Sequence, residues 1–387
     1  MALRDKLVTM AHGGGGKAMR DLISDVFTSV FQPPGHEDQA RLTSLALQEP
    51  DARLAFTTDS FVVTPLEFPG GDIGTLAVGG TVNDLAVGGA RPLWLSAAFI
   101  IEEGCPVDLL HRIAASMAAE AAKAGVCIVT GATKVVERGK GDGVFITTAG
   151  IGVIPPGCDI GAARIGPGDV AIVNGVLGDH GAAILAARGD LALSVDLISD
   201  CAGLGHLMKT ALQAAPGITA ARDCTSGGLA CVLNERASEA GRGIEIDEAS
   251  LALRPEVAGV CEILGLDPLY LANEGRLVVV CPPDQTQAAL TAMRALPEGA
   301  GAAAVVVGFA CEGQPGRVTL RTRFGGLRII DMLTGDQLPR ICCPPQAPGV
   351  QPVVRSGGAL PRGAGRMGQK LWHHGGQMIE RQAFLLP

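Results

Sequence analysis

Hydrophobic and polar residues follow two periods along most of the chain, and this pattern predicts a regular succession of strands and helices. A short apolar strand at 54–57 leads to Asp59, and residues 73–86 repeat apolar positions with a helical period. Further strands are expected at 93–103, 126–136 and 143–154, and a helix with a core-facing apolar stripe at 108–124. Residues 41–155 therefore predict a domain of mixed strands and helices.

The second half of the chain repeats this alternation after a break rich in proline and glycine at 157–168. Helices are expected at 179–188, 197–214, 255–263 and 284–295, and strands at 169–175, 243–248, 277–280 and 303–310. Strands that alternate with helices are typical of a layered α/β architecture. The pattern thus predicts a second α/β (α+β) domain that ends near residue 330, and a helix at 19–31 precedes the first domain.

Three carboxylates, Asp59, Asp72 and Asp84, lie in the glycine-rich, apolar stretch 57–92. Hard oxygen ligands of this kind hold Mg²⁺, which is usually bound by one or two carboxylates and substrate phosphates. A structural interpretation also fits each residue alone. Asp72 would cap the helix that follows it, Asp59 would be a turn residue, and Asp84 would be a solvated helix residue.

Polar residues at the ends of other predicted strands extend this set. Gly131 and Lys134 end the strand at 126–136, a place where α/β proteins commonly build sites, although a single lysine there is more often solvated. Asp223 precedes the start of a helix, and Glu274 lies on a turn before a strand, where a purely polar turn residue is equally plausible. The run HGGGGK at 12–17 lacks the spacing of a phosphate-binding loop, so it is either an anion-binding loop or a hinge.

Composition and charge narrow the class of protein. The 387 residues include 54 glycines and only 3% aromatic residues, which favours an α/β protein with many tight turns. The net charge of −8 argues against a nucleic-acid or anionic-membrane surface. The longest apolar run, 302–310, is too short to span a bilayer, and the N-terminus lacks a signal-peptide pattern, so we expect a cytoplasmic protein. The 11 cysteines should then be reduced, with Cys127 and Cys281 buried in strands.

Several segments, in the right order, carry a resemblance to a known family. They are HGGGGKAMRDLI, the stretch from TTDSF to RPLWLS, AGVCIVTGATKVV followed by GKGDG, GDHGAAI, the RD-x-T-x-GG segment, NEG, and GGLRIIDMLTGDQLPRIC. The chain resembles the carbamoyl dehydratase (HypE) family of hydrogenase maturation proteins over residues 8–342. That family belongs to the aminoimidazole-ribonucleotide-synthetase-like (PurM-like) ATP-binding proteins.

The resemblance implies a reaction on a cysteine of the C-terminal tail. A carbamoyl group carried by Cys342 would be dehydrated with ATP to a thiocyanate, which supplies cyanide to the iron of a [NiFe] hydrogenase. Glu274 would accept the proton, and Lys134 would meet phosphate or the carbamoyl oxygen. ATP binding is implied for Asp59, Asn83, Asp84, Gly131, Lys134 and Asp223, with Mg²⁺ held by Asp59, Asp84 and Asp223.

The resemblance also implies partners and a domain plan. The expected partners are a second copy in a homodimer, the HypF-type carbamoyltransferase that loads the cysteine, and the HypC–HypD-type iron scaffold that receives cyanide. The expected parts are an N-terminal segment (1–40), an ATP-binding domain (41–156), a linker (157–168), a C-terminal domain (169–332), a mobile tail (333–342) and an extension expected to lack fixed structure (343–387).

Three departures from the family pattern leave alternatives open. Ala132 stands where the family has an aspartate, Ser226 stands where an arginine is usual, and the chain continues beyond Cys342 with Cys343 and a run that holds one acid, Glu380. If the aspartate binds magnesium, ATP turnover should be weak. Another PurM-like kinase or synthetase, or a catalytically impaired maturation scaffold, therefore remains an alternative.

Overall fold

The computed structural model describes residues 5–34, 39–43, 49–189, 196–296, 301–312 and 315–334 of the chain. The chain divides into two compact units, Met1–Pro345 and Gln346–Pro387, and all described residues belong to the first. Cys342, Cys343 and the predicted extension at 343–387 lie outside the described residues.

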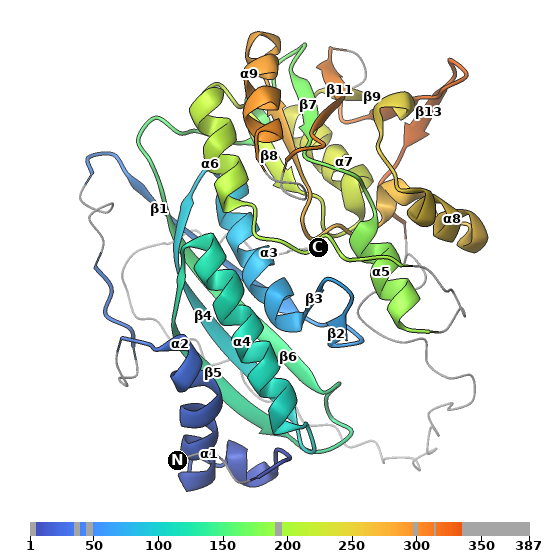
Figure 1. Cartoon of the computed structure of the whole chain (residues 1–387). Coiled ribbons are helices and arrows are strands. Elements are labelled where there is room, and N and C mark those ends of the chain that lie inside the picture. Colours follow the sequence, from blue (N-terminus) through green and yellow to red (C-terminus); the bar gives the residue numbers. More distant parts are fainter. Residues whose placement is uncertain are drawn as a thin grey trace, which may run out of the picture. The chain divides into compact units, whose positions relative to one another are not determined.

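The N-terminal part is built on a four-stranded sheet in the order β1-β6-β4-β5 (Figure 1). All neighbouring strands are antiparallel except β4 and β5, which are parallel and joined through helix α4. Helices α3 and α4 lie along one face of this sheet. The elements are β1 (Arg53–Phe61), β2 (Glu67–Phe68), β3 (Gly71–Asp72), α3 (Ile73–Val87), β4 (Arg91–Glu102), α4 (Val107–Ala124), β5 (Cys127–Val136) and β6 (Val144–Ile154).

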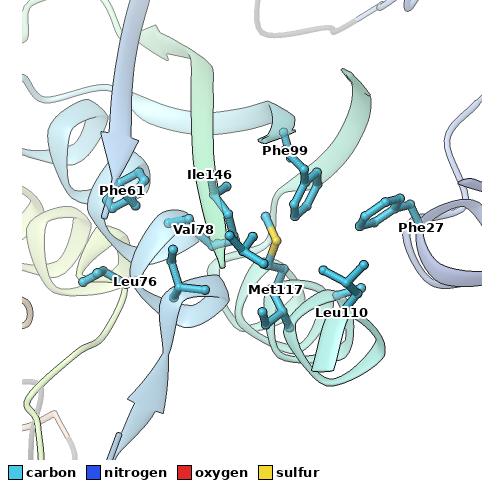
Figure 2. Packing of buried hydrophobic residues seen from close by; sticks show 14 of the residues in the cluster. Phe27, Phe61, Leu76, Val78, Phe99, Leu110, Met117 and Ile146 are labelled. Carbon is cyan, nitrogen blue, oxygen red and sulfur yellow. The ribbon is translucent and has the colours of Figure 1, made fainter. Parts of the chain in front are cut away.

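The core of this part forms where the two helices meet the sheet. Met117 and Leu110 of α4 pack beside Ile146 and Phe99, and Phe27 of the N-terminal helix stacks on Phe99 at 4.4 Å between ring centroids (Figure 2). Helix α3 is buried on nearly all sides, and only Thr75 and Asp84 of its residues are not buried. The reason is that α3 also contacts α6 (Gly205–Ala214) and β8 (Ala220–Asp223) of the C-terminal part.

The C-terminal part is built on a seven-stranded sheet in the order β13-β12-β9-β11-β7-β10-β8. Its strands are antiparallel except for the pair β12 and β9. The strands are β7 (Val170–Val173), β8 (Ala220–Asp223), β9 (Gly243–Asp247), β10 (Leu277–Cys281), β11 (Val305–Cys311), β12 (Val318–Arg321) and β13 (Leu327–Ile330). The helices are α5 (Asp179–Ala187), α6 (Gly205–Ala214), α7 (Gly228–Ala240), α8 (Pro255–Leu264) and α9 (Pro283–Arg294).

One predicted helix is wrong over nearly half its length. The prediction covered 197–214, whereas α6 begins only at Gly205 and residues 196–204 form an irregular connection. Backbone groups of this connection bond to distant residues instead of to one another: Ser199 N donates to Pro69 O at 2.8 Å, and Leu204 N donates to Asn83 Oδ1 at 2.6 Å. Tertiary hydrogen bonds therefore replace the helical ones.

Among the other local predictions, the N-terminal helix and the burial of Cys281 are confirmed, and the burial of Cys127 is wrong. The N-terminal helix is present as α1 (Lys17–Leu22), a π-helical stretch (Ile23–Thr28) and α2 (Ser29–Phe31). Cys281 is buried as predicted, but Cys127, the first residue of β5, is exposed. In the part of the chain that the structure describes, no helix has the length and apolarity needed to cross a bilayer.

Candidate functional site

Four carboxylates from four separate elements gather where the N-terminal and C-terminal parts meet. Asp59 comes from β1, Asp84 from α3, Asp223 from the end of β8, and Glu274 from the loop before β10. The negative charges of Asp200, Asp223, Asp59 and Asp84 add to the effect of burial and raise the pKa of Glu274 well above its ordinary value. The structure therefore brings together four residues that the sequence predicted separately.

Asp84 is the carboxylate that α3 leaves accessible. Its Oδ2 accepts a hydrogen bond from the Thr57 hydroxyl at 2.9 Å. Burial raises the pKa of Asp84 to about 6, and the charges of Asp223 and Asp59 add to the shift, while the Thr57 bond and the Arg222 guanidinium oppose it. An isolated half-buried carboxylate would gain from a cation at this place.

Asp59 faces α3 across a close approach that only glycine permits. A Cβ at Gly80 would lie 2.9 Å from the Phe61 ring and 4.0 Å from Asp59 Oδ2. The backbone N–H of Ser60 donates to Asp59 Oδ1 at 2.7 Å, yet burial, with help from the charge of Asp223, still raises the Asp59 pKa. Gly80 thus lets the strand that carries Asp59 pack closely on the helix that carries Asp84.

Asp223 completes the set from the C-terminal part. Its Oδ2 accepts a hydrogen bond from the Thr225 hydroxyl at 3.1 Å, and its Oδ1 lies 3.8 Å from Nε of Arg222. Ser226, two residues after the cysteine that follows Asp223, is exposed in the turn that precedes α7. Arg222 therefore places a positive charge beside Asp223 and Asp84.

Asn83 is buried, and its side chain joins the two parts of the chain. Nδ2 donates to Ala202 O at 3.0 Å and to Glu274 O at 3.4 Å, while Oδ1 accepts from Leu204 N. These contacts hold the backbone of Glu274 against α3. Asn83 therefore holds the backbone from which the Glu274 side chain extends.

Lys134 and Gly131 lie apart from this cluster within one chain. They are on β5, whereas Asp59 is on β1, and these strands form the opposite edges of the four-stranded sheet. Residues Asp59, Thr148, Ala97 and Gly131 pair in one row across the four strands, so Asp59 and Gly131 are about 14 Å apart at the usual strand spacing. Lys134 is exposed and pairs with Ile100, and Ala132 is exposed two residues before it.

Asp72 is the helix cap that the sequence predicted. Its Oδ1 accepts hydrogen bonds from Thr75 N at 2.8 Å and from the Ser116 hydroxyl at 2.6 Å. The carboxylate thereby satisfies the start of α3 and ties it to α4. This role accounts for Asp72 without a metal.

The carboxylates fit a magnesium ion that arrives with a nucleotide. Among the described residues, no three His, Cys, Asp or Glu side chains are grouped closely enough to hold a metal without further ligands. Mg²⁺ usually takes only one or two carboxylates and completes its shell with phosphates and water. The raised pKa values of Asp59 and Asp84 are what such an incomplete site would produce.

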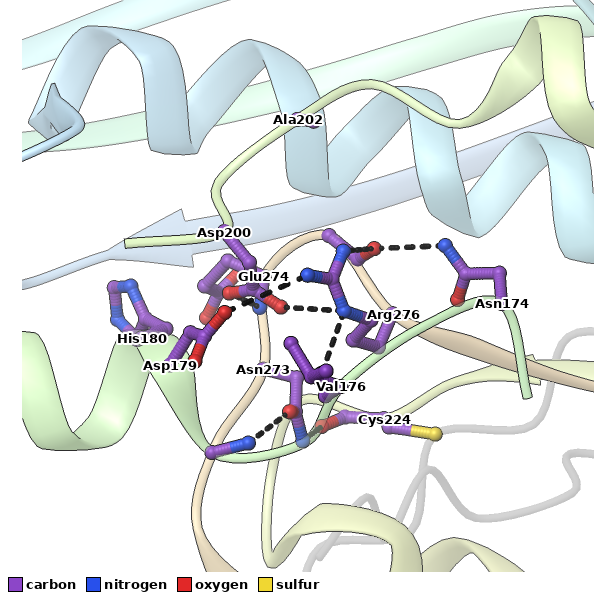
Figure 3. A network of polar contacts seen from close by, with 12 residues as sticks. Asn174, Val176, Asp179, His180, Asp200, Ala202, Cys224, Asn273, Glu274 and Arg276 are labelled. Atoms are coloured by element: carbon purple, nitrogen blue, oxygen red, sulfur yellow. Dashed lines mark hydrogen bonds and ion pairs between the residues drawn. The ribbon is translucent and has the colours of Figure 1, made fainter. Parts of the chain in front are cut away.

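A buried ion-pair network behind Glu274 was missed by the sequence reasoning. Arg276 Nε donates to Val176 O at 2.7 Å and lies 3.5 Å from Asp200 Oδ2, while its second terminal nitrogen lies 3.7 Å from Asp179 Oδ2 (Figure 3). Asp200 Oδ1 accepts the backbone N–H of Glu274 at 3.0 Å. The network therefore holds the Glu274 backbone by its N–H, whereas Asn83 holds it by its carbonyl. The misassigned helix at 197–204 concealed it.

The amide of Asn273 supports the same loop. Its Oδ1 accepts from Gly178 N at 2.7 Å, and its Nδ2 donates to Cys224 O at 3.0 Å (Figure 3). The motif NEG was noticed in the sequence only through the family resemblance. In the structure it places one side chain, that of Glu274, between two sets of buried polar contacts.

Comparison with known proteins gives this site a context. The model of the AIR synthase related protein N-terminal domain matches residues 36–154, and that of the C-terminal domain matches residues 166–321. The chain is 72% identical over 342 residues to the carbamoyl dehydratase HypE of Rhodobacter capsulatus. The aligned region covers 88% of this chain and 100% of that relative.

Solved structures agree with this relationship. A crystal structure of the hydrogenase maturation protein HypE in complex with ATP is 43% identical, covers 86% of this chain and 99% of its own, and has a TM-score of 0.81. A chain of the HypE–HypF complex is 45% identical, covers 72% of this chain and 90% of its own, and has a TM-score of 0.70. The chain therefore belongs to the AIR synthase related proteins, and within them to the HypE family of carbamoyl dehydratases.

Proposed function

We propose that the chain uses ATP to dehydrate an S-carbamoyl group on Cys342 to a thiocyanate, and so supplies cyanide for the iron of a [NiFe] hydrogenase. The observation that carries this proposal is the meeting of Asp59, Asp84 and Asp223 with Glu274, a carboxylate whose pKa is raised well above its ordinary value. The relationship to carbamoyl dehydratases, one of them solved with ATP, supports it.

The chemistry gives each carboxylate a separate task. The carbamoyl oxygen attacks the γ-phosphorus of ATP, the bond to ADP breaks, and Glu274 takes a proton from the carbamoyl nitrogen. The carbon–oxygen bond then breaks, phosphate leaves with that oxygen, and loss of the second nitrogen proton gives S–C≡N. Carbamoyl and ATP thus become thiocyanate, ADP and phosphate, with no oxidant or reductant.

We expect the ATP phosphates to bind beside the three aspartates, because their negative charge needs a bound cation there. Asp59, Asp84 and Asp223 would hold Mg²⁺, which neutralises the developing phosphoryl charge when bound. Glu274 lies beside them, and its raised pKa makes it a stronger base than a solvated glutamate. A base and a phosphate site that share one cleft are what dehydration by phosphorylation requires.

A homodimer would complete this site with residues that are distant within one chain. Leu54 and Phe56 on β1 are 65% and 71% exposed, and Ile100 on β4 is 42% exposed, so the sheet face away from α3 and α4 is apolar and accessible. If β5 of a second copy lies along β1, the strand that carries Gly131 and Lys134 would lie next to the strand that carries Asp59. We propose that Gly131 and Lys134 act on ATP in this way.

The further partners follow from the carrier chemistry. A HypF-type carbamoyltransferase would load Cys342, which agrees with the existence of a HypE–HypF complex among the related structures. A HypC–HypD-type iron scaffold would receive the cyanide. The cytoplasmic location and the domain boundaries at 41–156 and 169–332 stay predictions.

Intact mass spectrometry tests the proposal directly. The full chain is loaded by a HypF-type transferase, separated from it and mixed with ATP and Mg²⁺. We expect a carbamoyl adduct that loses the mass of one water in the wild type and in Cys343→Ala, and no adduct in Cys342→Ala. An adduct that stays intact while ATP is bound would refute the dehydratase assignment, and an adduct that moves to Cys343 would refute the choice of carrier.

A catalytically impaired scaffold is the second candidate, and Ala132 is the observation that favours it. The family aspartate is missing on β5, the same strand that carries Lys134. A scaffold would bind the transferase and the nucleotide without releasing phosphate. Shortening the chain after Cys342 separates this case from inhibition by residues 343–387, because only inhibition is relieved by the truncation.

A further inference from the structure

The loop that carries Glu274 lies directly on the backbone of residues 200–202. A Cβ built on Gly275 would clash with the backbone carbonyl of Asp200, so this contact admits no side chain. Asp200 Oδ1 accepts the N–H of Glu274 at 3.0 Å, and Ala202 N donates to Glu274 O at 3.4 Å. A shift of the backbone at Asp200 would therefore displace Glu274.

The Ser199 side chain closes a turn around Asp200. The N–H of Cys201 donates to Ser199 Oγ at 3.1 Å, a local bond of the kind that serine hydroxyls form in turns. The N–H of Ser199 donates to Pro69 O at 2.8 Å, and a Cβ built on Gly70 would lie 2.7 Å from Ser199 O. Because this connection has no helical or strand bonds of its own, these contacts decide where Asp200 lies.

The ring of His180 anchors the Ser199 hydroxyl from helix α5, next to Asp179 (Figure 3). Nδ1 lies 2.9 Å from Ser199 Oγ, and the ring is 1% exposed and meets Phe68 edge-on at 5.6 Å between centroids. Burial lowers the pKa of His180 to about 4, so the ring is neutral at pH 7. The hydroxyl accepts the Cys201 N–H, and its own hydrogen can be donated to Nδ1.

We propose that His180 and Ser199 are positioning residues for the dehydration, because together they hold Asp200 where it places Glu274. The contacts run from His180 Nδ1 to the Ser199 hydroxyl, through the turn to Asp200, and from Asp200 to the Glu274 N–H. Proton transfer requires hydrogen-bond distance between base and proton, and a misplacement of about 1 Å can slow a reaction about 10²-fold. The proposal rests on the function proposed above, in which Glu274 accepts the proton.

Paired variants of the full chain separate positioning from a general loss of stability. Ser199→Ala and His180→Phe, the loss variants, remove the hydroxyl and the ring acceptor. Ser199→Thr retains a hydroxyl, and His180→Asn retains an acceptor close to the position of Nδ1. The matched control is Thr219→Val, which removes a buried hydroxyl of the C-terminal part that donates to Asp169 Oδ2 at 2.9 Å.

Two readouts follow each variant, with the urea midpoint as the measure of global stability. The first is the single-turnover rate at which the carbamoylated chain loses water, followed by intact mass over a range of Mg²⁺–ATP concentrations. The second is amide hydrogen exchange of the peptide that contains Glu274, measured by mass spectrometry without nucleotide or carbamoyl loading. The second readout does not depend on the proposed activity.

We expect each loss variant to lower the maximal rate of water loss about 10-fold, since one buried hydrogen bond is lost. The ATP concentration for half the maximal rate should not change. Ser199→Thr and His180→Asn should recover most of the rate, and His180→Phe/Ser199→Ala should be no slower than the slower single variant, because both interrupt one chain of contacts. The Glu274 peptide should exchange faster in the loss variants. Thr219→Val should lower the urea midpoint but keep the wild-type rate and exchange.

The outcomes separate this proposal from the proposed function. A wild-type adduct that never loses water overturns the dehydratase function, and the exchange comparison still tests positioning. Wild-type rate and exchange in a folded loss variant overturn positioning alone, and either loss variant suffices if the other does not fold. An equal slowing in Thr219→Val also overturns it, because stability would then explain the effect. So does a loss variant that changes only the ATP requirement.

Discussion

Replacing Asp84 by asparagine should stabilise the nucleotide-free protein while it removes a proposed magnesium ligand. The carboxylate is half-buried beside Asp223 and Asp59, and its pKa is raised from 3.8 to about 6. A shift of this size corresponds to about 3 kcal/mol between the two protonation states. Because the side chain is partly solvated and Arg222 lies nearby, we expect a measured gain of about 1–2 kcal/mol.

The sign of the effect depends on pH in a defined way. Below about pH 4 the Asp84 carboxyl is protonated in both folded and unfolded chains, so wild type and Asp84→Asn should be equally stable. Between about pH 4 and pH 6 the unfolded chain loses this proton first, and the wild type falls behind the variant. Above about pH 6 the difference should stay constant. Asparagine keeps an oxygen that can accept the Thr57 hydrogen bond.

Urea unfolding of the nucleotide-free chain across this pH range measures the difference, with Glu262→Gln as the control for a lost surface carboxylate. Addition of Mg²⁺–ATP should then raise the midpoint of the wild type more than that of Asp84→Asn, because ligand binding stabilises only the competent site. A variant that is less stable than wild type at pH 8, or a difference that does not change with pH, would refute the electrostatic reasoning.

Three further predictions address the other parts of the site. Glu274→Gln should slow water loss from the carbamoylated chain about 10²–10⁴-fold with ATP affinity retained. The wild-type rate should rise with pH, because the Glu274 pKa lies above its ordinary range. Equal pH profiles for the wild type and the variant would contradict this interpretation. Ala132→Asp should raise phosphate release while Ala132→Asn does not, measured by a phosphate assay. Asn83→Ala should lower the free energy of unfolding by about 2–4 kcal/mol, since Leu204 N and the carbonyls of Ala202 and Glu274 each lose a hydrogen bond. Denaturant titration measures this change, and an unchanged midpoint would contradict it.

Elements with strong local periodicity could be predicted from the sequence, and those fixed by distant contacts could not. Helix α4 has apolar residues at helical spacing, and the structure places it within one residue of the predicted bounds. The connection 196–204 has apolar residues too, but its backbone bonds to Pro69 and Asn83, more than 100 residues away in the sequence. No local pattern encodes such partners.

The same distinction applies to the site. Asp59, Asp84, Asp223 and Glu274 could be singled out because each follows or precedes a recognisable element, but their proximity depends on how α3 is inserted between the two parts of the chain. Asp200 and Arg276 offered no signal, since each is a common charged residue whose importance comes only from burial. The edge position of β5, which separates Lys134 from Asp59, is likewise a property of strand order.

The arrangement of charges explains why this cleft should depend on its ligands. Folding brings Asp59, Asp84 and Asp223 together from three elements, and Asn83 and Asp200 hold the Glu274 backbone against them from two sides. Relaxation of the loop would relieve the repulsion, but Asn83 would lose its contact with the Glu274 carbonyl and Asp200 would lose the hydrogen bond from the Glu274 N–H. The repulsion is therefore retained in the folded chain, where it favours a cation at the aspartates and a proton on Glu274. A site that draws in both is suited to a reaction in which phosphate is transferred and a proton is removed at the same carbon–nitrogen unit.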